Sequence, residues 1–414
     1  MEAKRAVKLG VIGLGARGLP LINAVFLPMY DHGLVEVAAV CDVYRDRVDK
    51  AAETVKAKTG KTPFCTTDWR EVISCPEVEA VLVLSAWESH IEICIAAMKA
   101  GKPVGTEVGG AYNVYDCHRL VTVYEETGVH CMMLENCCYG RRELMALNMA
   151  RLGVFGTVVN CDGGYLHDLR EEIVNGDINR HYRQRNYSLR NCENYPTHEL
   201  GPIMQILNIN RGNRMVCLNS VASCARGLRE YAAEHRGADH PLAKRDYAQG
   251  DIVTTVIRCA GGETIRLTLD TTLPRIYSRG LAVRGTKGMY AMDGDYVHMD
   301  GENEFASMSD KIGNAEKYAE QYEHPIWREY RANPIGGHDG IDWLVYNAFV
   351  ESVREGIAPP IDTYDTATLM CISALSEESI AAGGAAVGIP DFTHGKWIER
   401  LESPEDKLGS YSLR

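Results

Sequence analysis

The segment from Val7 to Gly18 (VKLGVIGLGARG) leads a short apolar strand directly into three glycines with the spacing G-x-G-x-x-G. In a dinucleotide-binding chain, the first glycine permits a tight turn, the second lets a pyrophosphate approach the backbone, and the third allows close helix packing. The phosphates then lie at the N-terminus of a helix, expected here over Leu19 to Tyr30, where unpaired N–H groups favour anions. The predicted cofactor loop comprises Gly13, Leu14, Gly15, Ala16, Arg17 and Gly18.

A chain with 39 glycines can contain such a spacing by chance. The residues after the loop are therefore needed to support a dinucleotide site. A second apolar run, Val35 to Val40, is followed by Cys41 and Asp42. A carboxylate at that position accepts hydrogen bonds from the adenosine ribose hydroxyls, so Asp42 favours NAD over NADP. Arg45 and Arg47 could accommodate a 2′-phosphate, and a Rossmann-like unit that binds no dinucleotide is the alternative interpretation.

The strand–helix alternation continues beyond this second strand. The expected elements are a strand within Val78 to Ser85, a helix over Glu88 to Ala100, a strand over Pro103 to Glu107, a helix over Val114 to Thr127 and a strand over His130 to Leu134. Continuous apolar strands joined by helices are typical of a parallel sheet covered on both faces. With right-handed crossovers this pattern predicts a Rossmann doubly wound sheet over residues 1–137.

Ligands of such sheets bind outside the carboxyl ends of the strands. Polar residues follow several of the expected strands, Glu135 among them, and His90 is equally interpretable as a helix-cap or surface histidine. The further residues that we expect beside the cofactor are Ser85, Trp87, His90, Glu107, Val108 and Asn136.

From about Gly140 the pattern changes, which indicates a second domain over residues 138–414. A helix over Arg142 to Leu152 precedes strands with period-two alternation. These strands are expected near Val158–Tyr165, Met215–Ser223, Asp251–Arg258, Thr264–Thr271 and Gly280–Arg284, with a hairpin at Ala260–Gly262. The sequence therefore predicts an α+β domain with an open, mainly antiparallel sheet.

Two stretches and the C-terminal part complete this second domain. Arg226 to Gln249 is expected to be a long loop or short helix, and Gly301 to Ala332 another irregular stretch. Helices are expected over Ile341 to Gly356 and Asp365 to Ala382, so the C-terminal helices begin at about residue 341.

Composition limits the possible partners and compartments. A net charge of -12 argues against nucleic acid or an anionic membrane surface as a partner, and no stretch is apolar enough to cross a membrane. Only six residues precede the first expected strand, so we expect a cytoplasmic protein without a signal peptide. The 14 cysteines lie mostly in apolar runs without metal-ligand spacing, so no metal is expected.

Two polar clusters in the second domain could carry chemistry. One is Gly164 to Asp168 (GYLHD), and the other is Arg190 to Pro202, which leads into an apolar helix over Ile203 to Leu207. Tyr195 and His198 in the second cluster suit acid–base catalysis if a nearby cation, such as an oxidised nicotinamide ring, lowers the pKa of the phenol from ~10. The alternative is that these tyrosines and histidines have structural roles only.

Longer stretches carry a resemblance to a known family. The glycine loop, Asp42 and the run DWLVYNAFVESVREGIAPPIDTYDTATLMCISALSEESI resemble the Gfo/Idh/MocA oxidoreductase superfamily. More narrowly, the chain resembles the NAD-dependent α-N-acetylgalactosaminidase-like enzymes of glycoside hydrolase family 109. The motifs that carry this resemblance are GGYLHDLR (163–170), NYPTHELGP with NINRGNR (194–214), ASCARGL (222–228), the stretch 250–278 and GGHDGIDWL (336–344).

The resemblance implies glycoside hydrolysis through redox steps. Bound NAD takes hydride from C3 of the sugar, a base removes the acidified C2 proton, the C1 leaving group is eliminated, water adds, and the hydride returns. By the same resemblance the catalytic residues are Tyr165, Tyr195 and His198, and the substrate-binding residues are His167, Arg183 and Tyr277. The superfamily also implies a homodimer or homotetramer.

Two departures from the family patterns bear on this expectation. Superfamily dehydrogenases have Glu-Lys-Pro after the fourth strand, whereas this chain has Glu107-Val108-Gly109-Gly110 and lacks the lysine. That loss argues against the main alternative, an NAD-dependent sugar or cyclitol dehydrogenase. A third interpretation is a dinucleotide-binding scaffold without activity. Glu199 replaces the small residue that the hydrolases carry after the histidine, which puts a preference for N-acetylgalactosamine in doubt.

Overall fold

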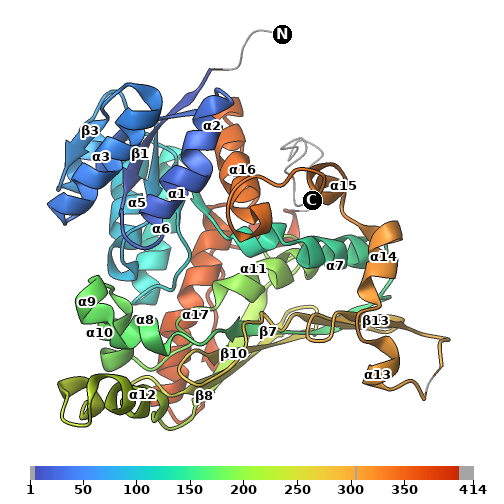
Figure 1. Cartoon of the computed structure of the whole chain (residues 1–414). Coiled ribbons are helices and arrows are strands. Elements are labelled where there is room, and N and C mark those ends of the chain that lie inside the picture. Colours follow the sequence, from blue (N-terminus) through green and yellow to red (C-terminus); the bar gives the residue numbers. More distant parts are fainter. Residues whose placement is uncertain (1–4, 304, 401–414) are drawn as a thin grey trace.

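The computed structural model describes residues 5–303 and 305–400, which form two sheets and the helices around them (Figure 1). The first sheet has six parallel strands in the order β3-β2-β1-β4-β5-β6. These strands are β1 Val7–Ile12, β2 Val35–Cys41, β3 Phe64–Thr66, β4 Ala80–Val83, β5 Val104–Thr106 and β6 Cys131–Met133. The strand order reverses between β1 and β4, as in a doubly wound sheet, so the predicted Rossmann fold is confirmed.

Helices cover both faces of this sheet, and capping residues within the sequence determine where some of them begin and end. They are α1 Gly18–Leu21, a π-helical turn Ile22–Phe26, α2 Leu27–Asp31, α3 Arg45–Thr59, α4 Trp69–Ser74, α5 His90–Lys99 and α6 Val114–Thr127. In α6, the Asn113 side chain accepts a hydrogen bond from the Asp116 N–H at 2.8 Å, and Gly128 ends the helix in the left-handed conformation.

The second sheet has eight strands in the order β13-β12-β11-β7-β10-β9-β8-β14. Its strands are β7 Val158–Leu166, β8 Met215–Ala222, β9 Ile252–Cys259, β10 Thr264–Asp270, β11 Ala282–Gly285, β12 Gly288–Ala291, β13 Tyr296–Met299 and β14 Val387–Gly388. Every neighbouring pair is antiparallel except β7 with β10. The predicted open, mainly antiparallel sheet is therefore confirmed.

The remaining helices lie around this sheet and between the two sheets. Besides further short 3-10 turns, they are the 3-10 turn η3 Asn136–Tyr139, α7 Arg141–Arg151, α8 Arg170–Val174, α9 Gly176–Asn179, α10 Arg183–Leu189, α11 Thr197–Ile206, α12 Gly227–Arg236, α13 Met308–Lys311, α14 Ala315–Tyr322, α15 Pro325–Tyr330, α16 Ile341–Glu355 and α17 Thr363–Ala381. Figure 1 shows α7, α11 and α17 on the side of the second sheet that faces the Rossmann unit, while its opposite face lies open at the bottom of the view.

Two local predictions were wrong. The stretch Gly301 to Ala332 contains α13, α14 and α15, whose turns depend on tertiary contacts such as the ion pair between Glu316 and Arg141 at 2.8 Å. The helix expected over Ile203 to Leu207 begins earlier, at Thr197, so His198 lies in its first turn rather than before it.

Helix α17 connects the second part of the chain to the edge of the Rossmann sheet. The Thr363 and Thr366 hydroxyl oxygens each accept a hydrogen bond at 2.9 Å, from the backbone N–H groups of Cys131 and Met133 in β6. Helix α16 lies beside β1, where the Tyr346 ring packs edge-on against Phe26 with centroids 5.1 Å apart. These contacts fix the carboxyl end of β6, and hence Glu135, relative to the second sheet.

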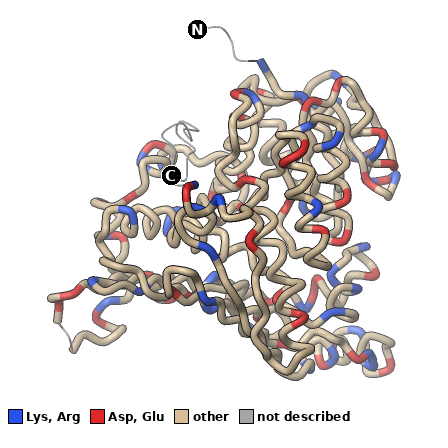
Figure 2. The backbone as a smooth tube through the Cα atoms, turned by 180° about the vertical axis from the view of Figure 1, so that it is seen from behind, with Lys and Arg blue, Asp and Glu red and all other residues tan. Residues whose placement is uncertain are grey.

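Charged residues are dispersed over the molecule. In Figure 2 basic and acidic residues alternate along both units. Within residues 5–303 and 305–400, no helix is long and apolar enough to cross a membrane.

Candidate functional site

A single cavity of about 1300 Å³ runs between the carboxyl ends of the Rossmann strands and the second unit. It is lined by all six residues predicted to be catalytic or substrate-binding. Ten of the predicted cofactor residues line it as well: Gly13, Gly15, Ala16, Arg17, Asp42, Ser85, His90, Glu107, Val108 and Asn136. The structure therefore brings together residues from both ends of the chain in one space, whose volume exceeds that of usual drug-sized ligand sites.

The glycine loop has the geometry of a phosphate cradle. Gly13 has a φ of +100°, and a Cβ there would collide with the Leu84 backbone, while a Cβ on Gly18 would collide with the Gly13 carbonyl oxygen. Gly15 differs, because the nearest atom to its Cβ position is Arg47 Nη1 at 3.2 Å, across the cavity wall. Backbone packing thus requires Gly13 and Gly18, and Gly15 leaves room for a diphosphate, so the loop fits a dinucleotide.

Asp42 ends β2 at the predicted ribose position. Its Oδ2 accepts a hydrogen bond from the Leu14 N–H at 2.8 Å, and its Oδ1 accepts one from the Tyr44 N–H at 3.0 Å. Each carboxylate oxygen has a second lone pair, which suits the two hydroxyls of a ribose. Arg47 Nη1 lies 3.6 Å from Oδ2.

Glu107, next to the position where superfamily dehydrogenases have the lysine, belongs to a partly buried ionic network. Arg17 donates from Nε to Glu107 Oε1 at 3.0 Å, and its Nη1 and Nη2 donate to Asp342 at 2.9 and 2.7 Å. His338 Nδ1 lies 2.8 Å from Asp342 Oδ2. Although burial alone would raise it, the pKa of Asp342 is held low by the His338 and Arg17 hydrogen bonds. Asn136 also donates to Asp342 Oδ1, at 2.8 Å.

Two stacked tyrosines line the end of the cavity where we expect the sugar, called the sugar end below. The Tyr165 and Tyr195 ring centroids are 4.1 Å apart, and His198 lies edge-on to both, at 5.3 and 4.8 Å. Burial raises the pKa of both phenols, and the nearby Arg183 guanidinium opposes that shift. Tyr165 Oη also lies 3.0 Å from His167 Nδ1. The Arg183 cation favours phenolate, but burial outweighs it, so the pKa of both phenols lies above its ordinary value.

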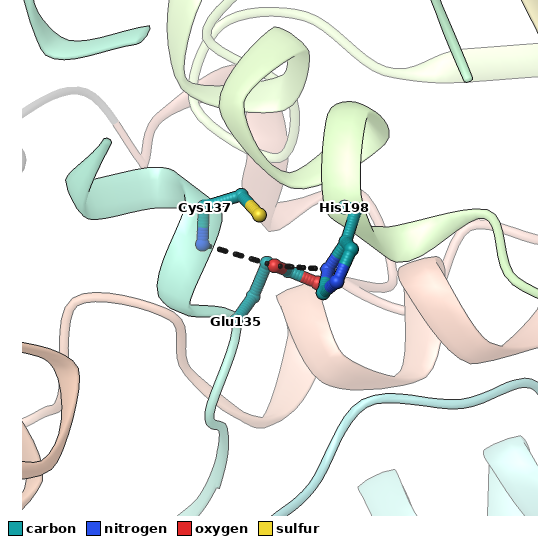
Figure 3. A group of neighbouring side chains, drawn as sticks. All are labelled: Glu135, Cys137 and His198. Carbon is teal, nitrogen blue, oxygen red and sulfur yellow. Dashed lines mark hydrogen bonds and ion pairs between the residues drawn. The ribbon is translucent and has the colours of Figure 1, made fainter. Parts of the chain in front are cut away.

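Glu135, one of the polar residues that we expected at the carboxyl ends of the strands near the cofactor, contacts His198 (Figure 3). His198 Nδ1 lies 2.8 Å from Glu135 Oε1, which also accepts the Cys137 N–H at 3.1 Å. Although burial alone would raise it, the charge and hydrogen bond of His198 keep the pKa of Glu135 low. Because an ionised carboxylate only accepts hydrogen bonds, Nδ1 carries a proton, and Nε2 is the ring nitrogen that does not contact Glu135.

By residue type, Glu135, Cys137 and His198 are also a possible metal set, since their ligating atoms lie within 4.8 Å of one another. The 2.8 Å separation of the carboxylate and imidazole is a hydrogen-bond length. It is shorter than the edge of a tetrahedral zinc site with bonds of ~2.0 Å, which is about 3.3 Å. The geometry therefore favours a carboxylate–histidine pair.

Glu199, which replaces a small residue of the family pattern, is connected to Tyr277 through Arg279. Arg279 Nε lies 3.1 Å from Glu199 Oε1 and 2.6 Å from Glu143 Oε1, and its Nη1 donates to the Tyr277 hydroxyl at 3.3 Å. Burial and the nearby Glu143 carboxylate raise the pKa of Glu199 well above its usual range. Arg279 therefore links Glu199 to Tyr277, one of the residues that we expect to bind substrate.

Three predicted cofactor residues do not line the cavity. Leu14 and Gly18 are packed inside the loop, and Trp87 is buried against Tyr182 and Tyr195, with ring centroids 4.9 and 5.8 Å away. His90 lines the cavity but its Nε2 lies 2.9 Å from the Ser85 carbonyl oxygen. Sequence reasoning left Arg279 out of the site, although it lies only two residues after Tyr277.

Comparison with known proteins identifies the family of the chain. Residues 139–399 match the family described as "Glycosyl hydrolase 109, C-terminal domain", and residues 7–135 match "Oxidoreductase family, NAD-binding Rossmann fold". The chain belongs to glycosyl hydrolase family 109. The α-N-acetylgalactosaminidase of Tannerella forsythia is 38% identical over 419 residues, covering 95% of this chain and 88% of the relative. A family 109 protein of Stenotrophomonas maltophilia is 38% identical over 422 residues, covering 96% and 91%.

Solved structures show the same two-unit fold. An NAD binding oxidoreductase from Klebsiella pneumoniae matches with a TM-score of 0.69 at 16% identity, covering 94% of this chain and 100% of that one. Levoglucosan dehydrogenase in complex with NADH and levoglucosan matches with a TM-score of 0.65 at 18% identity, covering 93% and 100%. Family 109 membership confirms the predicted NAD-dependent glycosidase, and the dehydrogenase alternative is not better supported.

Proposed function

We propose that this family 109 protein cleaves glycosides of N-acetylgalactosamine or a related sugar by transient oxidation at C3, elimination across C1 and C2, water addition and reduction. The supporting observation is the shared cavity, in which the glycine loop and Asp42 lie at one end and Tyr165, Tyr195 and His198 at the other. The activity named for the Tannerella forsythia relative supports the choice of sugar.

NAD, when bound, supplies the redox chemistry by accepting a hydride from C3 of the sugar and later returning it. Gly13, Gly15 and Ala16 would hold its diphosphate, and Asp42 would hold the adenosine ribose. Ser85, His90 and Asn136 line the same cavity.

The proton chemistry belongs to the tyrosines and the histidine. His198, with a proton on Nδ1 held by Glu135, has Nε2 free to take the proton of the C3 hydroxyl or of the attacking water. The C2 proton goes to the phenolate oxygen of Tyr165 or Tyr195, because the adjacent ketone acidifies that carbon and the Arg183 cation stabilises phenolate. His167 and Tyr277, with ring centroids 4.9 Å apart, form the facing wall of the sugar end.

The test is glycosidase activity without added cofactor. The purified protein should release nitrophenol from a nitrophenyl α-N-acetylgalactosaminide, and the sugar released in heavy water should carry deuterium at C2. Accumulation of NADH in proportion to product would support the dehydrogenase instead. A panel of α- and β-glycosides then identifies the sugar, the anomer and the effect of Glu199.

We also propose a homodimer or homotetramer formed through the open face of the second sheet. Val221 and Val256 are exposed there on β8 and β9, beside the Arg266–Asp162 ion pair. Light scattering of the wild type and of Val256→Lys tests this, since a charge at the interface should shift the population toward monomer. The 14 unpaired thiols support a reducing compartment, and we propose the cytoplasm.

A further inference from the structure

The segment Gly176–Arg185, which comprises α9, a connecting turn and the start of α10, crosses from the second unit to the Rossmann unit. Eight of its residues line the cavity: Gly176, Asp177, Arg180, His181, Tyr182, Arg183, Gln184 and Arg185. We propose that this segment is a clasp that retains the dinucleotide between turnovers, and that Arg47 is the cofactor-binding residue through which it acts.

The clasp is tied to α3 of the Rossmann unit by charged contacts. Arg180 donates from Nη1 and Nη2 to the two Asp46 carboxylate oxygens, at 3.0 and 2.7 Å, and its guanidinium lies 4.2 Å from the Tyr44 ring centroid. The Arg47 Nη2 donates to the Asn179 carbonyl oxygen at 3.0 Å. A bidentate pair and a carbonyl contact therefore join residues 179–180 to 46–47.

Arg47 also reaches the phosphate loop. Its Nη1 lies 3.2 Å from the position that a Cβ on Gly15 would take and 3.6 Å from Asp42 Oδ2. Only 19% of its side chain is exposed. One guanidinium thus contacts the clasp on one side and faces the predicted diphosphate and ribose positions on the other, and its remaining N–H donors suit phosphate or hydroxyl oxygens.

This inference rests on the proposed function in one respect. A cycle that returns the hydride to the same sugar requires the dinucleotide to stay, whereas a dehydrogenase must exchange it at each turnover. Contacts that slow release therefore favour the hydrolytic cycle and would limit a dehydrogenase.

The experiment measures the rate at which the purified holoprotein releases NAD, by exchange against isotopically labelled NAD in the absence of sugar. Arg180→Ala or Asp46→Ala should each speed release about two- to fivefold, the range of a partly exposed ion pair. The double variant should be no faster than the faster single one, because both remove the same pair. Raising the salt concentration should speed wild-type release and have less effect on the variants.

Two further variants make the test specific. Lys58→Ala removes an ion pair of similar exposure on the same helix, with Asp31 at 2.7 Å, away from the cavity, and should leave release unchanged. The charge swap Asp46→Arg with Arg180→Asp should restore slow release. Arg47→Ala should speed release more than either clasp variant, since it removes the clasp contact and the cofactor contact together.

The proposal is overturned if release is unchanged in the clasp variants, or if Lys58→Ala speeds it equally. Since no sugar is present, the outcome is independent of glycosidase activity. A chain that holds NAD through these residues but incorporates no deuterium at C2 of the sugar would refute the hydrolytic function and leave the clasp intact.

Discussion

Replacing Glu135 by glutamine tests how the site prepares His198. The carboxylate is fully buried and lies 2.8 Å from Nδ1, so the imidazole loses a charge-assisted hydrogen bond in this variant. The new amide can present an N–H to Nδ1 and so favour the tautomer with its proton on Nε2, the nitrogen needed for proton transfer. Backbone packing should persist, because glutamine has nearly the same shape.

The expected loss in kcat/KM follows from the hydrogen bond that Glu135→Gln removes. A hydrogen bond to a charged group contributes about 1.5–3 kcal/mol, which corresponds to a loss of roughly 10- to 150-fold in kcat/KM. The bound NAD content should stay at the wild-type value, since the Glu135 carboxylate contacts His198 and the Cys137 N–H. The assay is nitrophenol release, with NAD measured after heat denaturation of the protein.

A double variant supplies the decisive comparison. If Glu135 acts through His198, Glu135→Gln combined with His198→Ala should be no slower than His198→Ala alone. Additive losses would refute this reasoning, and so would a Glu135→Gln variant with wild-type kcat/KM. Loss of activity on chelation, regained with zinc, would show instead that Glu135, Cys137 and His198 bind a metal.

Tyr195→Phe and His198→Ala should each depress turnover at least 100-fold with NAD still bound, and near-normal activity of either would show that the proton chemistry lies elsewhere. Gly18→Ala should lower the melting temperature and the NAD content, because its Cβ would collide with the Gly13 carbonyl oxygen. Burial raises the pKa of Glu193 to about 8, against an opposing backbone hydrogen bond from Tyr195. The folded protein then holds a proton that the unfolded chain has lost, so this group lowers stability as pH rises from about 4.5 to 8; Glu193→Gln should flatten that decline in chemical denaturation curves.

Local signals allowed much of the fold to be predicted. Helix α6 has the expected bounds because Asn113 caps it and Gly128 ends it, both within the segment itself. Strand β3 is only Phe64–Thr66 and lies at a sheet edge, so too few residues are buried to give a pattern. The helices α13, α14 and α15 were missed because each is shorter than the window in which helical periodicity is recognisable.

The sequence allowed us to predict which residues line the candidate site, but not which side chains pair with one another there. Tyr165, Tyr195 and His198 were expected to act together, and they lie in one cavity. The pairing of Arg17 with Asp342, 325 residues apart, has no local signal. The Glu135–His198 pair likewise joins the end of a Rossmann strand to a helix of the second unit, which only the three-dimensional fold brings together.

The two threonines of α17 have a consequence for how copies of this chain can meet. An edge strand with free N–H groups is a template on which another strand can pair. On β6, the hydroxyl oxygens of Thr363 and Thr366 accept hydrogen bonds from these N–H groups. This edge of the Rossmann sheet is therefore covered by side chains of the same chain. Growth of a continuous intermolecular sheet across β6 is thereby blocked, and self-association must proceed face to face rather than edge to edge there.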